Sequence, residues 1–341
     1  MKKRATITDL ALEAGVSVAT VDRVLNRRLP VREDTALRVV AAAETIGYHA
    51  TGLLRQRVTE AKQCSLGFLL QKRGDDFYRA LGAELQAATI AASSIRGKAT
   101  VEFMDELVPS FIAGKIREMG ARVNVLAVVA VDHFLVNEAI EEVVGRGKAV
   151  FTLLSDVTSP ARSGYIGVDA RKTGRTAAWT ISRLARKPGK IGILLGSHRY
   201  LSQETAEISF RSYMRESAPQ FQLLEPLVNL DDQRIAYEAV TDMIASHEDL
   251  VGIYMAGGGV EGLVRALRDS NAEKDIAVVC NELMPVTRTA LIDGTIDMVL
   301  ATPVSQLATH AVNSMARAYL TERSDRNVVQ LQAEIYISEN I

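Results

Sequence analysis

Residues 15 to 26, GVSVATVDRVLN, combine a capping serine with a short helix whose outward face could contact another molecule. Ser17 is a good N-cap, because its hydroxyl can accept a hydrogen bond from a free N–H group of the first turn. Val21, Val24 and Leu25 recur at helical spacing and predict one buried stripe. The opposite face carries the side chains of Val18, Ala19, Asp22, Arg23 and Asn26. Small residues followed by a cation and an amide indicate a helix that lies against a partner.

Three helices must position that face. The first begins at Thr6 and ends at Gly15, the second is the helix just described, and the third runs from Glu33 to about Ile46. A helix, a tight turn with glycine and a second helix form a helix-turn-helix, in which the second helix enters the major groove of DNA. The small side chains at the start of the second helix would allow close approach to base edges.

The charge of the chain is distributed unevenly. Residues 1–58 hold ten Lys and Arg against six Asp and Glu, a balance of +4, whereas the whole chain of 341 residues has a net charge of −1. A basic end on an acidic body is typical of a nucleic-acid-binding head, although a solvated surface has the same composition. The length predicts two or three domains, and 48% hydrophobic residues with 24% charged residues indicate a globular protein.

Several classes of protein are disfavoured by composition. Cys64 and Cys280 lie far apart and are expected to be buried reduced thiols, and the five histidines lack metal-ligand spacing, so we expect no metal and no cofactor. Acidic and polar residues interrupt any signal core at the N-terminus. The longest apolar run, VLAVVAV at 125–131, is too short to span a bilayer. We therefore expect a cytoplasmic protein with no membrane contact.

From Cys64 onward, buried strands alternate with amphipathic helices. We expect strands at 65–70, 99–104, 125–131, 149–154, 190–196, 251–257, 276–281 and 296–301. We expect helices at about 76–92, 134–145, 171–186, 204–217, 233–246, 260–270, 285–292 and 304–320. Such alternation predicts an α/β fold with two doubly wound parallel-sheet lobes. Ligands in such folds bind beyond the carboxyl ends of the strands.

The whole sequence resembles the lactose-repressor (LacI/GalR) family. ATITDLALEAGVSVATVDRVLN and TALRVVAAAETIGY resemble the headpiece of that family, and YIGVDARKTGRTAAWTISRL, GIYMAGGGVEGLVRAL and VCNELMPVTRTALIDGTIDMVLATP resemble its effector-binding body. That body is similar to periplasmic ribose-type binding proteins. The resemblance implies a homodimeric regulator, most simply a repressor, that binds a palindromic operator in double-stranded DNA. It also implies that a small molecule, commonly a sugar, is held between two lobes and sets the affinity for DNA.

The resemblance assigns roles in the headpiece. The base-reading positions fall on Val18, Ala19 and Arg23, and Arg23 is the candidate for a bidentate contact to guanine. Phosphate contacts fall on Thr6, Ser17 and Thr20, and the candidate DNA-binding set also includes Asn26 and Tyr48. Asp22 replaces the usual serine, which costs affinity near phosphates unless its carboxylate accepts from a cytosine amino group or pairs with Arg23 or Arg27.

Residues 49–58, HATGLLRQRV, correspond to the hinge helix that the family presses into the minor groove. Ala50 and Thr51 replace the usual proline and asparagine, and Arg57 occupies the position of the intercalating leucine. Leu53 and Leu54 remain candidate wedges, and Arg57 could instead enter a narrow groove electrostatically.

Candidate ligand groups in the body follow the predicted strands. They are Asp76, Phe77, Tyr78, Asp132, His133, Ser155, Asp156, Asp169, Asn281 and Glu282, together with two altered family positions, Ser209 and Ala301. Aromatic rings give a platform for the C–H face of a sugar, and carboxylates accept hydrogen bonds from its hydroxyls. The excess of acids predicts a neutral sugar or polyol, with an amine-bearing ligand as second choice and an anionic sugar as the least favoured.

An enzyme is the alternative class. GGGVEG at 257–262 fits the G-x-G-x-x-G pattern after a strand, and Glu282 ends the next strand where a ribose-binding acid would lie in an NAD(P)-dependent oxidoreductase. A headpiece has no role in such an enzyme, and a tight turn that lines the cleft also accounts for the glycines. We therefore expect no enzymatic activity.

The predicted organisation is a DNA-binding headpiece at 1–48, a hinge at 49–63 and an effector-binding domain at 64–341. By resemblance, the first lobe comprises 64–163 and 302–324, and the second comprises 164–301 and 325–341.

Overall fold

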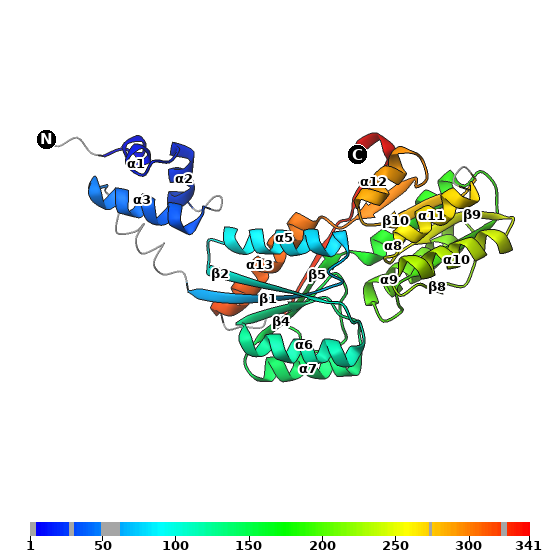
Figure 1. Ribbon diagram of the computed structural model, residues 1–341, viewed down its shortest axis with the longest axis horizontal. Helices are drawn as coiled ribbons and strands as arrows, with labels where there is room; N and C mark the ends of the chain where they lie inside the picture. Colours follow the sequence, from blue (N-terminus) through cyan, green and yellow to red (C-terminus); the bar gives the residue numbers. More distant parts are fainter. Residues whose placement is uncertain (1–4, 27–30, 49–61, 273–274, 322–325) are drawn as a thin grey trace.

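The structure is a computed structural model that describes residues 5–26, 31–48, 62–272, 275–321 and 326–341. A small helical headpiece precedes a larger body of two lobes, and the headpiece lies on the side of the first lobe (Figure 1). No helix in these ranges is long and apolar enough to cross a membrane.

The headpiece consists of α1 (Ile7–Glu13), α2 (Val18–Asn26) and α3 (Glu33–Thr45). Thr6 and Asp9 form the capping box that begins α1, because each side chain accepts a hydrogen bond from the other residue's backbone N–H. The apolar stripes of the three helices meet in one core that includes Leu10, Val21, Val39 and Ala43. The predicted helix-turn-helix is confirmed.

The first lobe is built on a fully parallel six-stranded sheet in the order β12-β5-β4-β3-β1-β2. Its strands are β1 (Gln63–Gln71), β2 (Arg96–Met104), β3 (Val125–Val128), β4 (Ala149–Leu153), β5 (Gly164–Val168) and β12 (Asn327–Leu331). Apolar cores cover both faces, one under α5 (Asp76–Ala91) and α13 (Val304–Thr321), the other under α6 (Pro109–Arg122) and α7 (Phe134–Gly145) (Figure 1).

The second lobe has a sheet in the order β13-β11-β10-β9-β6-β7, with β8 also paired to β6 and β13 antiparallel to β11. Its strands are β6 (Lys190–Leu195), β7 (Gln222–Leu223), β8 (Leu227–Val228), β9 (Leu250–Met255), β10 (Ala277–Asn281), β11 (Met298–Ala301) and β13 (Glu334–Tyr336). Its helices are α8 (Ala170–Leu184), α9 (Leu201–Ser217), α10 (Gln233–Ser246), α11 (Val260–Ser270) and α12 (Pro285–Ile292), followed by the 3₁₀ turn η1 (Ser338–Asn340).

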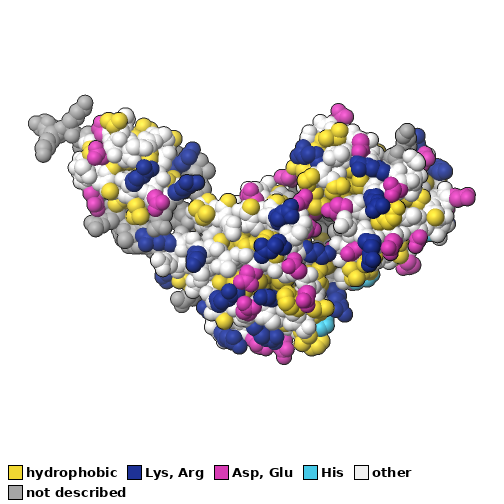
Figure 2. All heavy atoms as spheres, in the orientation of Figure 1, with side chains coloured by type: hydrophobic (Ala, Val, Ile, Leu, Met, Phe, Trp, Pro, Cys, Tyr) yellow, Lys and Arg dark blue, Asp and Glu magenta, His cyan; other side chains and the backbone are white. Residues whose placement is uncertain are grey.

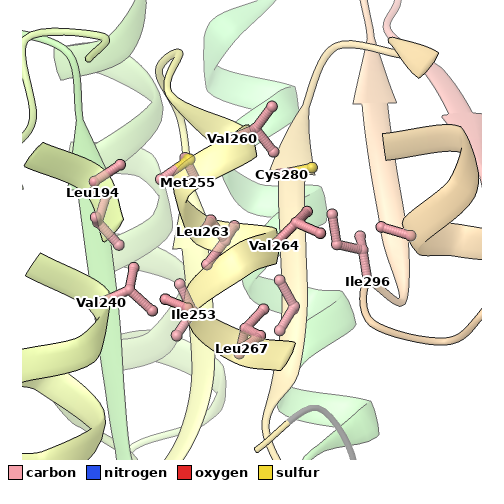
Figure 3. Close-up of a cluster of buried hydrophobic side chains, with 14 of the residues drawn as sticks. Leu194, Val240, Ile253, Met255, Val260, Leu263, Val264, Leu267, Cys280 and Ile296 are labelled. Carbon is pink, nitrogen blue, oxygen red and sulfur yellow. The ribbon is translucent and has the colours of Figure 1, made fainter. Parts of the chain in front are cut away.

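Helix α11 packs deeply in the second lobe. Leu263, Val264 and Leu267 of this helix face the buried side chains of β9 and β10 (Figure 3). Gly262 lies so close to α10 that an added Cβ would come within 1.9 Å of the carbonyl oxygen of Gln233. The glycine is therefore required for the contact between α10 and α11.

The predicted α/β fold class is confirmed, and the structure adds elements that the sequence patterns missed. Helix α6 and the strands β5, β7, β8, β12 and β13 were not predicted. The predicted lobe boundaries also need correction, because β5 and β12 belong to the first sheet and not to the second lobe. Each pairs in parallel with a neighbour there, so residues 164–168 and 327–331 complete the first sheet before the chain crosses over. The crossings follow Val168, Ala301 and Leu331, at the carboxyl ends of their strands.

Candidate functional site

A cavity of about 130 Å³ lies between the two lobes, at the carboxyl ends of their strands. Apolar side chains form part of its wall, namely Phe77, Leu154, Val168, Val260 and Met284. The polar side chains that line it are Gln71, Lys72, Asp75, Tyr78, Thr173, Ser202, Gln203, Asp231, Asn281, Glu282 and Thr302. Because both lobes contribute, a molecule bound here would contact both at once.

Three carboxylates line this cavity. Asp75 is the N-cap of α5, and its Oδ1 accepts from the backbone N–H groups of Phe77 at 2.9 Å and Tyr78 at 3.4 Å. Asp231 follows β8, and its Oδ1 accepts from the N–H of Gly258 at 2.6 Å. Glu282, which follows β10, accepts from Thr302, through Oε2 from the backbone N–H at 3.0 Å and through Oε1 from the hydroxyl at 2.6 Å.

Burial changes the acidity of these groups. Removal from water raises the pKa of Glu282 to about 7, although both hydrogen bonds from Thr302 act in the opposite direction, and the nearby charge of Asp75 raises it further. Burial likewise raises the pKa of Asp231, against the effects of the Gly258 N–H and the Lys72 ammonium. The cavity is thus a place where negative charge is poorly solvated.

Lys72 connects the two lobes across the cavity. Its Nζ donates to the backbone carbonyl oxygens of Leu230 at 3.2 Å and Asp231 at 2.7 Å. All three residues have positive φ angles, 35° at Lys72, 54° at Leu230 and 52° at Asp231. L-residues rarely adopt this left-handed region, and such strain concentrates at functional sites.

Gln71, which lines the cavity, accepts hydrogen bonds from two phenols. The hydroxyls of Tyr78 in the first lobe and Tyr200 in the second each donate to Oε1 of Gln71 at 3.1 Å. The rings of Phe77 and Tyr78 meet edge to face with centroids 5.3 Å apart. Together they form a rigid aromatic corner.

Four of the predicted ligand residues line the cavity, namely Phe77, Tyr78, Asn281 and Glu282. Ser155 lies next to it, where its Oγ accepts from the N–H of Ser202 at 3.3 Å. Ala301 is buried immediately before Thr302, and Ser209 is buried on α9. Ser155, Ser209 and Ala301 do not line the cavity, so fewer residues are available to contact a ligand than the sequence predicted.

The structure places the other predicted acids and His133 outside the cavity lining. Asp76 pairs with Arg79, and Asp156 forms an ion pair with Arg162. Asp132 accepts from Asn137 and Thr158, while Asp169 and His133 are the N-caps of α8 and α7. Each of these side chains stabilises a turn or a helix end, because strand ends lead directly into helix starts in this fold.

Several polar lining residues were not predicted, namely Gln71, Lys72, Asp75, Thr173, Ser202, Gln203, Asp231 and Thr302. Asp75 lies one residue before a predicted position, and its capping role was the signal that could have identified it. Asp231 follows a two-residue strand that has no recognisable sequence pattern. Gln71 and Lys72 extend the first predicted strand by two residues.

The exposed face of α2 carries four of the predicted DNA contacts, Val18, Ala19, Arg23 and Asn26. Ser17 caps the helix, as its Oγ accepts from the N–H of Thr20 at 3.1 Å. On the view in Figure 2, basic and acidic side chains are interspersed over the headpiece and the body.

The remaining headpiece candidates are placed differently. Asp22 accepts a hydrogen bond from Nδ2 of Asn26 at 2.6 Å, and it forms no ion pair with Arg23 in the described part of the chain. Tyr48 is buried in the headpiece core, where it supports the fold. Leu53, Leu54 and Arg57 lie outside the described residues, as does Arg27.

The glycine-rich stretch 257–262 is a strand-to-helix turn that contacts the chain itself. Gly259 has a φ of 84° and begins α11. The carboxylate of Asp231 accepts from the Gly258 N–H at the start of this helix, where the pyrophosphate of a dinucleotide would have to bind. An added Cβ at Gly257 would also come within 2.4 Å of the backbone nitrogen of Gly196. The glycines are thus explained by contacts within the lobe, and the oxidoreductase alternative lacks support.

Two protein families match the chain. Residues 6–51 match the family of bacterial regulatory proteins, lacI family, and residues 66–322 match the periplasmic binding protein domain.

Curated relatives are transcriptional regulators. The regulator MalR of Streptomyces coelicolor is 27% identical over 203 residues, 57% of this chain and 55% of MalR. The regulator GalR of Salmonella typhimurium is 39% identical over 77 residues, 23% of this chain and 22% of GalR. The chain thus spans about half the length of MalR in this alignment.

Solved structures share the fold of the body. A solute-binding protein of an ABC transporter from Agrobacterium vitis, bound with α-D-tagatopyranose, has a TM-score of 0.75 at 18% identity, over 82% of this chain and 96% of that protein. A solute-binding protein from Burkholderia graminis in complex with D-arabinose has a TM-score of 0.74 at 19% identity, over 82% and 97%. At this identity the likeness shows the fold.

Proposed function

The chain belongs to the lacI family of bacterial regulatory proteins, and from that premise we propose that it is a transcriptional repressor whose affinity for DNA is set by a small sugar or polyol. The observation that carries the proposal is the cavity between the lobes, which residues of both lobes line. A ligand there gains most contacts when the lobes are closed, so its binding biases the body toward one arrangement.

The class of effector follows from the wall of the cavity. The aromatic corner of Phe77 and Tyr78 offers an apolar surface, and Asp75, Asp231 and Glu282 offer acceptors for hydroxyl groups. A phosphate or carboxylate would meet three carboxylates in a buried place. The names of the structural neighbours, which include tagatose- and arabinose-bound proteins, support a sugar.

The DNA-binding unit is the headpiece. We propose that α2 enters the major groove, that Arg23 reads a guanine and that Val18 and Ala19 contact neighbouring bases. A homodimer would present two such helices to a palindromic operator. The protein then acts in the cytoplasm, where the DNA lies, and has no catalytic role, in keeping with relatives that are regulators.

The proposed organisation follows the sheets. The headpiece comprises 1–48 and the hinge 49–62. The first lobe comprises 63–168 and 304–331, and the second comprises 170–301 and 334–341, because the strands and helices within these ranges pack together.

Thermal unfolding of the full chain against a panel of sugars and polyols tests the effector. A ligand at a hundred times its Kd stabilises the native state by about 2.7 kcal/mol, so the true effector class raises Tm. A parallel titration on DNA tests the headpiece, with binding to an inverted repeat expected to weaken steeply as salt increases. No shift with any sugar or polyol, together with equal affinity for one half-site and for the full palindrome, would refute the proposal.

A further inference from the structure

Most hydroxyl donors of the cavity are already engaged within the protein. The hydroxyls of Tyr78, Thr173 and Thr302 give their single hydrogen to Gln71, to the carbonyl of Asp169 and to Glu282. Lys72 uses two of its three hydrogens on backbone carbonyls. Of the hydroxyls that line the described cavity, Ser202 alone has its hydrogen uncommitted.

An acceptor of Asp75, in contrast, remains available. The side chain of Asn281 is engaged within the protein, since its Nδ2 donates to the carbonyl of Ala256 at 3.0 Å and the buried Tyr254 hydroxyl shares a hydrogen bond with it. Only Oδ1 of Asp75 accepts a hydrogen bond in the described part of the chain, which leaves Oδ2 open. An open carboxylate oxygen in this wall favours a ligand that supplies hydrogens.

The charges of the wall point the same way. Three carboxylates face one ammonium, Lys72, among the described residues that line the cavity. The carboxylates of Asp75 and Glu282 are close enough for the charge of the first to raise the pKa of the second. A positive charge on the ligand would relieve this repulsion.

We infer that the effector carries a protonated amine, as an amino sugar or amino polyol whose ammonium is held by Asp75 and Glu282. The inference rests on the proposed function and narrows its ligand class. A neutral hydroxyl needs a donor for its own lone pairs, and three of the four hydroxyls that line the described cavity have committed their hydrogen. An ammonium group has three hydrogens and no lone pair, which suits a wall whose carboxylates outnumber its cations.

Calorimetry on the full chain with matched ligands tests the amine. The pairs are galactose with galactosamine, glucose with glucosamine, and sorbitol with 1-amino-1-deoxysorbitol, at a pH where the amine is protonated. The amine of at least one pair should bind at least about tenfold more tightly than its neutral partner, and N-acetylation should remove the gain. Equal or tighter binding of the neutral member in every pair would refute the inference that the effector carries an amine, while the proposed function would stand. If no amine binds, the inference also fails, and the thermal panel decides the function separately.

Charge-removing variants locate the ammonium. Asp75→Asn keeps a capping oxygen, and Glu282→Gln keeps both bonds to Thr302, because the hydroxyl can accept from the amide. Each should weaken the amine at least about tenfold and its neutral partner far less. Asp76→Asn is the matched control, since Asp76 pairs with Arg79 outside the cavity and is 46% exposed. Equal weakening of both ligands by Asp75→Asn and Glu282→Gln would show that these carboxylates bind hydroxyls, which contradicts the inference.

Discussion

The ammonium nitrogen of Lys72 in the first lobe lies 2.7 Å from the backbone carbonyl oxygen of Asp231 in the second. This contact crosses the cavity and joins two segments with left-handed backbone conformations. It places a positive charge in a cavity lined by three carboxylates and is one of the hydrogen bonds that join the two lobes.

Replacing this lysine should weaken the binding of a neutral sugar. Lys72→Met keeps most of the apolar stem and removes two charge-assisted hydrogen bonds between the lobes, so a neutral sugar that contacts both lobes should bind about tenfold more weakly. Lys187→Met, at an exposed lysine far along the chain, is the control and should have no effect. Calorimetry that returns the same Kd for the Lys72 variant and the parent would show that the contact does not support closure.

The stability of the protein should depend on Glu282 between about pH 4.5 and 7. Burial raises the pKa of this carboxyl from 4.5 to about 7 in the folded state, so the folded protein binds a proton that the unfolded chain releases. The resulting stability is complete below pH 4.5 and is lost as the pH rises through 7, by up to about 3 kcal/mol. Thermal unfolding across this range should show a shallower decline for Glu282→Gln. Parallel pH profiles of the variant and the parent would contradict the assignment.

The affinity for an amine should rise with pH, whereas the stability of the protein falls. Glu282 faces Asp75 and Tyr78 in the cavity and follows Cys280, and it becomes an anion as the pH passes about 7. The affinity for an amino sugar should therefore rise over this interval, while that for a neutral sugar changes little. Calorimetry with one matched pair at several pH values provides the measurement. An affinity for the amine that does not change with pH would show that Glu282 does not bind it.

Arg23 should read one base in each half-site. It is exposed on α2, and no ion pair holds it in the described part of the chain. Arg23→Ala should cost about 1 to 3 kcal/mol per contact and relax the preference at one position. Sequencing of DNA selected from a random library shows both effects. Uniform weakening on all sequences would mean that Arg23 contacts phosphate only.

Asp22 should influence which bases are preferred. Its carboxylate holds Nδ2 of Asn26 at 2.6 Å, so Asp22→Ser frees the amide as well as removing a charge. The ranking of selected half-sites should therefore change. The same selection experiment would refute this if binding became tighter everywhere and the ranking stayed the same, since simple repulsion from phosphates would then suffice.

The sequence predicted the regular parts of the fold better than the irregular ones. A capping residue and helical periodicity predicted α2, and apolar runs predicted most of the buried strands. These signals are local, so they can be read from the sequence. Helix α6 was missed because it contains Gly114 and Gly120, and glycine is unfavourable within a helix. Gly120 is nevertheless needed, because an added Cβ would come within 2.7 Å of Val143 on α7.

The candidate site was predicted in part for a related reason. The rule that ligands bind at strand ends identifies the region of the site but not the individual residues. Within that region, the orientation of the first turn of α5 decides which acid faces the cavity. Asp75 caps α5 and lines the cavity, whereas Asp76 pairs with Arg79 outside it. Asp231 comes from a loop whose position depends on tertiary contacts with Gly196 and Gly258, which no local pattern contains.

The most direct test of the central claim is the affinity of the full chain for its selected palindrome with and without a saturating cavity ligand. We expect a change of about 5- to 150-fold, the usual range of coupling between two sites, and a smaller change in the Lys72→Met variant. Identical affinities with and without a ligand that calorimetry shows to be bound would contradict control of DNA binding through the cavity.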